Sequence, residues 1–272
     1  MRPLSSGFSA STTPFLRFSP GPALNTSLRN EKGRTGKAGS ASYGGVASER
    51  LLAGVLGTSA AILLVGGIAL ALFWAPEDAN QGFSQKIFYV HVPIALTAYA
   101  SFGFGAWKAL RLLWTGGTHY DLESYTAIHI GVIFGLLTLV TGSIWAKISW
   151  GYWWTWGERQ LVLFLILFLF YSAYFMLRYS TEPGPRRERN SAVYALFGVV
   201  LIPVSFLAVR IAGTILHPTI FTHEGANLPG SMLFAFCVCL AGMLALAATL
   251  YRVELAGKRA DQSLRELREL LA

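Results

Sequence analysis

A tryptophan-rich stretch is the first place in the sequence where chemistry could occur. Residues 149–159 read Ser-Trp-Gly-Tyr-Trp-Trp-Thr-Trp-Gly-Glu-Arg and hold half of the eight tryptophans of the chain, Trp150, Trp153, Trp154 and Trp156. Indole rings are large, flat and mostly apolar, and they stack well on another flat group. So many of them in a short polar segment predict a platform for a flat apolar ligand. The alternative is an aromatic belt that anchors helix ends at the membrane interface.

Two histidines are placed to work with this platform. His91 lies in Tyr89-Val90-His91-Val92-Pro93, and His217 lies in Leu216-His217-Pro218. Pro93 suits the first turn of a helix, and Pro218 disfavours helix at the residue before it, so both histidines are expected at helix ends. Each could instead bond a lipid headgroup or a loop carbonyl. As a pair level with the platform, two neutral imidazoles match the axial ligands of a six-coordinate haem iron.

Other features bear on what such a site would bind. Zinc is the weaker alternative, because it usually takes three or four protein ligands and no cysteine is expected on that side. Haem carries two propionates, and Arg159 can bond a carboxylate in bidentate fashion, or can anchor the start of a helix at the interface. Lys147 could do the same less specifically. Arg210 falls within an apolar segment and needs either a propionate or an internal partner.

The elements that must hold these residues are membrane helices. The chain has 272 residues, 53% of them hydrophobic and 13% charged, whereas soluble domains carry about 25% charged residues. Six apolar segments are each near the roughly 20 residues of a helical span, and backbone inside a bilayer must be helical. We therefore predict an all-α integral membrane protein with a tryptophan-rich external loop at 147–160 and a bundle of six transmembrane helices at 51–74, 88–112, 123–146, 160–178, 191–216 and 231–251.

The basic residues predict the orientation of this bundle. If the N-terminus is cytoplasmic, all 22 basic residues fall on the cytoplasmic side except Lys86, Lys147, Arg159 and Arg210. This bias is the one that the positive-inside rule describes. Both termini are therefore expected in the cytoplasm, and the tryptophan loop and both histidines at the outer face. The membrane would be the inner or plasma membrane of a prokaryote, or the inner membrane of an organelle.

The parts outside the spans are less informative. Residues 1–50 are rich in Ser, Gly, Thr and Arg and are predicted to be a disordered basic extension. An organelle presequence, or a start codon assigned too far upstream, would look similar. Residues 51–251 form the transmembrane domain. Residues 252–272 are predicted to be a cytoplasmic amphipathic tail that lies on the membrane or packs on a partner helix. Since the charge of +8 follows from the topology, no nucleic-acid partner is expected.

The motifs resemble those of a known family. The run Trp150-Gly151-Tyr152-Trp153-Trp154-Thr155-Trp156 is similar to the "WWD" signature of haem-handling membrane proteins, Trp-Gly-x-Trp-Trp-x-Trp-Asp. Within these proteins the chain most closely resembles the CcmC family of cytochrome c maturation. The resemblance lies in Asp78, Gln81-Gly82, Lys86-Ile87-Phe88-Tyr89-Val90-His91-Val92-Pro93 and Leu216-His217-Pro218. The resemblance covers about Phe73 to Pro218 and is specific over these three motifs.

The resemblance implies a function of haem transfer rather than catalysis. Such proteins hold haem b non-covalently at the outer face of the membrane, here between His91 and His217 as axial ligands and against the tryptophan loop. They pass it to a membrane-anchored haem chaperone and associate with subunits of an ABC-type complex. The site residues would then be Trp150, Gly151, Trp153, Trp154, Trp156 and Arg159 for haem, with His91 and His217 on the iron.

Two departures from the family pattern and two rival functions stay open. Gly157 stands where the signature has Asp, so either the acid has shifted to Glu158 or its role is lost. The Trp pair that many relatives carry before the second histidine is replaced by Arg210-Ile211-Ala212-Gly213. One rival is a related lyase that attaches haem to apocytochrome c; such relatives carry extra external histidines, for which only His223 is available. The other rival is a small-solute transporter.

Overall fold

The computed structural model describes residues 22–271 except 80, 212–215, 218–220 and 223–224, with side chains from Ser48 onward and not at 208–211, 221–222 and 226. The chain divides into two units, Met1–Arg50 and Leu51–Ala272. The elements, in order, are α1 (Pro22–Phe73), the 3-10 helix η1 (Phe83–Ile87), α2 (Phe88–Thr115), α3 (His119–Trp150), α4 (Arg159–Tyr179), α5 (Pro185–Val199), α6 (Leu201–Ile211), β1 (Phe221–Thr222), β2 (Gly225–Ala226) and α7 (Gly230–Leu271).

The predicted fold class is confirmed. In the part of the chain that the structure describes, six helical stretches are long and apolar enough to cross a membrane: Ser48–Phe73, Phe83–Thr115, His119–Trp150, Arg159–Tyr179, Pro185–Leu207 and Gly230–Leu271. Each overlaps one predicted span. The observed helices are longer at several ends, because helix continues past the apolar stretch into polar residues. The two strands, of two residues each, form a small antiparallel pair outside these spans.

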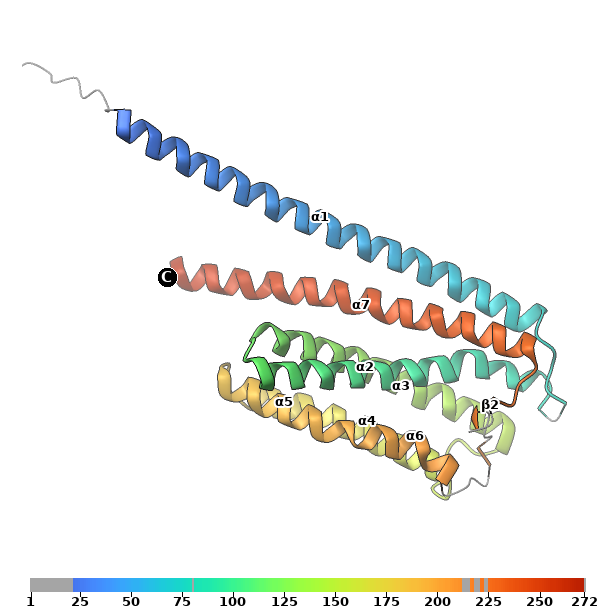
Figure 1. Cartoon of the computed structure of the whole chain (residues 1–272). Helices are drawn as coiled ribbons and strands as arrows, with labels where there is room; N and C mark the ends of the chain where they lie inside the picture. The colour runs from blue at the N-terminus through green and yellow to red at the C-terminus, as the bar shows by residue number, and fades with distance from the viewer. Residues whose placement is uncertain (1–21, 80, 212–215, 218–220, 223–224, 272) are drawn as a thin grey trace, which may run out of the picture. The chain divides into compact units, whose positions relative to one another are not determined.

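Helices α2 and α3 form the centre of the second unit. They pack along each other, with α7 on one side and α4, α5 and α6 on the other (Figure 1). The close approach of α2 to α3 depends on Gly131, because a Cβ there would come within 2.6 Å of the Phe102 ring. The Phe102 ring in turn stacks on Tyr171 of α4, with centroids 4.1 Å apart. The Phe102 ring therefore packs against both α3, at Gly131, and α4, at Tyr171.

The fifth predicted span is two helices end to end rather than one. Helix α5 ends at Val199 and α6 begins at Leu201. Pro203 accounts for the break, because it has no N–H to donate to the carbonyl of Val199, four residues earlier, and its ring crowds that carbonyl. At the turn, Val200 N–H instead donates to the carbonyl oxygen of Phe197, three residues earlier, at 3.4 Å.

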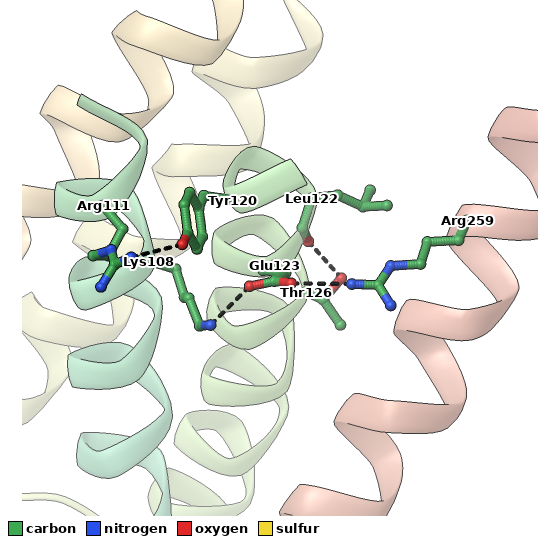
Figure 2. Close-up of polar contacts among 7 residues, drawn as sticks. All are labelled: Lys108, Arg111, Tyr120, Leu122, Glu123, Thr126 and Arg259. Atoms are coloured by element: carbon green, nitrogen blue, oxygen red, sulfur yellow. Dashed lines mark hydrogen bonds and ion pairs between the residues drawn. The ribbon is translucent and has the colours of Figure 1, made fainter. Parts of the chain in front are cut away.

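Ion pairs fasten α2, α3, α4 and α7 at the end of α2 that is far from His91. Glu123 lies between Lys108 and Arg259, with N–O distances of 2.8 and 3.0 Å (Figure 2). Beside it, both partners of a bidentate pair are buried, since Arg178 donates to the two carboxylate oxygens of Asp121 at 2.7 and 2.5 Å. Removal of one partner of a buried pair typically costs about 3–5 kcal/mol. This end of the bundle is therefore held by charge rather than by apolar packing alone.

The terminal segments are helical where the structure describes them. The backbone of residues 22–50 belongs to α1, where the composition predicts disorder, and residues 252–271 continue α7 without a break. In the predicted amphipathic tail Leu255 is buried, whereas Leu264, Leu267, Leu270 and Leu271 are exposed. Disorder of residues 1–50 and membrane contact of the tail stay predictions.

Candidate functional site

The first predicted ligand, His91, lies near the start of α2. The 3-10 helix η1 leads directly into α2, so His91 is in the first turn and Pro93 in the second turn rather than the first. The approach to this helix is held by Lys86, whose buried ammonium donates to the carbonyl oxygens of Ala75 at 2.5 Å and Pro76 at 3.3 Å. A cation on carbonyls that follow a helix C-terminus is favourable. The motif residue Lys86 thus anchors the start of α2 to the end of α1.

The loop between α1 and η1 is shaped by the other motif residues. The side chain of Asp78 accepts a hydrogen bond from the backbone N–H of Gln81 at 2.9 Å. Gly82 has a φ of 55°, in the left-handed region where glycine is favoured. Asp78 and Gly82 are also joined by a backbone bridge. These residues therefore position His91 through the backbone.

The imidazole of His91 is oriented by Thr141 of α3. His91 Nδ1 lies 2.8 Å from Thr141 Oγ1, and the same hydroxyl donates to the carbonyl oxygen of Leu137 at 2.8 Å. A hydroxyl has one proton to donate, so when it is donated to the carbonyl oxygen of Leu137, the threonine oxygen accepts a hydrogen bond from His91 Nδ1. The proton of the neutral ring is then on Nδ1, and the lone pair of Nε2 is available to a metal.

Gly142 makes room for this ring. A Cβ at Gly142 would lie 3.0 Å from His91 Cε1 and 3.7 Å from each ring nitrogen. The imidazole therefore rests against the bare backbone of α3. Thr141 and Gly142 together limit where the His91 ring can lie.

Trp145 brings the two predicted histidines together. Its ring centroid lies 6.4 Å from that of His91, with the planes 29° apart, and 5.8 Å from that of His217, edge to face. It also contacts Trp150, at 5.3 Å. Only 8% of Trp145 is exposed. Two imidazoles separated by 126 positions in the sequence thus meet the same indole.

Sequence reasoning missed both Thr141 and Trp145. Their spacing in the sequence could have pointed to them. Thr141 and Trp145 are four residues apart, so they share a face of the helix that leads into the tryptophan loop. Neither residue belongs to a motif of the loop, and the partner of that face could not be known before α2 was placed against α3.

The tryptophan loop follows α3 directly. Trp150 is the last residue of α3, and the helix ends because Gly151 adopts a left-handed φ of 83°. Trp153 and Trp156 are 61% and 73% exposed, while Trp154 packs edge-on against Trp156 at 5.7 Å. The indole N–H groups of Trp145 and Trp154 are buried without a hydrogen-bond partner among the described residues. Arg159 begins α4 immediately after the loop.

The remaining predicted site features are either in residues that the structure does not describe or have no matching arrangement among the described residues. The side chain of Arg210 and the whole of His223 belong to the part that is not described. Among the residues that are described, no three His, Cys, Asp or Glu side chains come together as a metal site, so the zinc alternative gains no support from them. Cys237 is exposed and Cys239 is buried; both are free thiols.

Comparisons with known proteins identify the family. The family model of heme exporter protein C matches residues 39–269. Heme exporter protein C of Haemophilus influenzae is 32% identical over 199 residues, covering 71% of this chain and 80% of the relative. The protein of the same name from Paracoccus denitrificans is 35% identical over 195 residues, covering 65% and 76%. A ccmC-like mitochondrial protein of cytochrome c biosynthesis from Marchantia polymorpha is 28% identical over 187 residues, covering 69% and 79%. The chain belongs to the heme exporter protein C family.

Proposed function

We propose that this protein binds haem b non-covalently between His91 and His217 and delivers it to a membrane-anchored haem chaperone for the maturation of c-type cytochromes. The observation that carries the proposal is the contact of both imidazoles with Trp145 in a member of the heme exporter protein C family. Haem is the cargo, and the protein is proposed to transfer it rather than to catalyse its covalent attachment.

The side chains around the two histidines fit a haem. The hydrogen bond to Thr141 leaves Nε2 of His91 available for the iron, and axial histidines usually have such a partner on the other nitrogen. Trp145 and Trp150 supply aromatic surface beside the porphyrin. Arg159, at the start of α4 and next to the loop, would pair with a propionate in bidentate fashion. The exposed rings of Trp153 and Trp156 would present the haem edge to the chaperone.

The proposal includes an orientation and further partners. With both termini in the cytoplasm, the tryptophan loop and the two histidines face the outer side of the membrane, where c-type cytochromes would receive haem. The distribution of basic residues supports this orientation. Subunits of an ABC-type complex are the proposed membrane partners. The membrane is proposed to be the inner membrane of a prokaryote, and the mitochondrial relative keeps the inner membrane of an organelle as the alternative.

Replacement of each histidine by glycine tests the proposal. His91→Gly and His217→Gly should each lose most of the haem that purifies with the protein, measured as low-spin haem absorbance per protein. Free imidazole should restore part of it, because it can enter the space that the side chain leaves. His119→Gly is the matched control, since His119 begins α3 at the opposite end of that helix. Unchanged haem in both site variants would remove the axial-ligand assignment.

A further inference from the structure

Glu158 is buried although it lies at the start of a helix, where acidic side chains are usually exposed. It is the residue before α4, at the N-cap, and only 2% of it is exposed. Acidic residues at helix starts usually stay in water or cap the free N–H groups of their own helix. The side chain of Glu158 makes no capping bond to α4. A buried carboxylate needs hydrogen-bond donors from elsewhere.

The donor comes from a segment that is distant in the sequence. The backbone N–H of Leu216 donates to Glu158 Oε2 at 2.9 Å. Leu216 directly precedes His217, whose ring contacts Trp145. Glu158 directly precedes α4 and closes the tryptophan loop. One carboxylate therefore ties the end of the loop to the backbone beside the second histidine.

We propose that Glu158 is a positioning residue for His217, and this inference rests on the proposed function. By holding Leu216 N–H, the carboxylate keeps the His217 imidazole directed at Trp145 and at the haem. Hydrogen bonds to a charged group are about twice as strong as neutral ones, so the tether suits Leu216 and His217, which are not part of a helix. It also couples the two parts of the site, since displacement of the loop by a docking partner would pull on the backbone at Leu216.

This assignment gives the departure at Gly157 a physical meaning. The acid of the signature stands one place later in this chain, at the residue that precedes Arg159 and α4. Apart from its two neighbours in the chain, a Cβ at Gly157 would have one atom within 4 Å, Thr155 Oγ1 at 3.9 Å. At position 158 the side chain is buried and reaches Leu216.

Hydrogen exchange of the haem-free protein tests the tether without depending on haem. In Glu158→Ala the peptide that contains Leu216 should exchange about tenfold faster, because a hydrogen bond to a charged group is lost. In Glu158→Gln exchange should rise less than in Glu158→Ala, since an amide oxygen of the same size can still accept the bond although the charge is lost. Glu158→Asp, one methylene shorter, should resemble the alanine variant and covers the case in which that variant does not fold.

Absorption spectra of the haem-loaded variants test the consequence for His217. Glu158→Ala and Glu158→Asp should shift the low-spin spectrum toward high spin, and imidazole should reverse the shift; Glu158→Gln should keep the low-spin spectrum. Unchanged exchange at Leu216 in both shortened variants would overturn the inference. Faster exchange at Leu216 in these variants together with an unchanged low-spin spectrum would also overturn the inference. A wild-type protein that binds no haem, with the exchange effect intact, would instead refute the proposed function and leave the tether standing.

Discussion

At the scale of single residues, one hydroxyl determines how His91 can act. With its proton donated to the carbonyl of Leu137, four residues earlier in α3, the Thr141 hydroxyl accepts a hydrogen bond from the imidazole. The ring is also pressed against Gly142, which leaves little freedom to rotate. Partners of this kind hold a metal-binding histidine in the required tautomer and raise its basicity.

Loss of this acceptor should weaken haem binding without removing the ligand itself. Thr141→Val has a similar shape but no oxygen, and it should lower haem affinity by about tenfold or more, the range typical of partners behind a metal ligand. Titration of the purified protein with haem measures the affinity. Thr141→Ser keeps the hydroxyl and should bind as the wild type does. Equal affinities of the valine and serine variants would show that Thr141 does not orient His91.

At the scale of elements, α3 and the loop after it carry most of the proposed site. Thr141, Gly142, Trp145 and Trp150 all belong to the last turns of this helix, and Gly151 ends it with a left-handed φ. Helix α2 contributes His91, and the segment after α6 contributes His217. The two proposed ligands thus come from separate elements, while one helix supplies Trp145, the ring that both contact.

Truncation of the loop tryptophans should impair haem delivery more than haem binding. Trp154→Ala combined with Trp156→Ala removes two rings that contact each other. The Trp156 ring is exposed and could contact a partner. Loss of large aromatic groups from an interface commonly costs more than tenfold in affinity, so chaperone loading should fall by about that factor. Loading is measured as haem covalently bound to the chaperone. Trp114→Ala, exposed near the end of α2, is the control, and normal loading in the double variant would leave the loop as an interfacial anchor only.

At the scale of the whole transmembrane unit, the two ends of α2 and α3 differ in chemistry. One end gathers indoles and imidazoles around Trp145. The other holds ion pairs of Asp121 with Arg178 and of Glu123 with Lys108 and Arg259 (Figure 2). The proposed orientation places the aromatic end outside and the ion-paired end on the cytoplasmic side.

Labelling of single cysteines should reveal this orientation. Cys237→Ser with Cys239→Ala gives a background without thiols. Tyr152→Cys, in the exposed loop, should react with a membrane-impermeant maleimide in intact cells. Glu182→Cys, exposed in the connection between α4 and α5, should react only after lysis. The reverse pattern would contradict the topology inferred from the basic residues.

Sequence reasoning could locate the spans and name His91, His217 and the tryptophan loop, because apolar length, basic residues and motif spacing are all local properties of the chain. It could not place Trp145, since no pattern near this residue tells which side chains face it. Nor could it foresee the break before Leu201, because a proline in an apolar run is compatible with either a kinked or an interrupted helix.

The sequence by itself determined a six-span membrane protein with two histidines and a cluster of tryptophans beside its helices. Only the tertiary structure decided which residues support them: Thr141 lies 50 positions from His91, and Leu216 lies 58 positions from Glu158. The physical reason is that membrane insertion depends on the hydrophobicity of each segment alone, whereas a hydrogen bond between distant residues exists only after the helices have packed at one distance and one rotation.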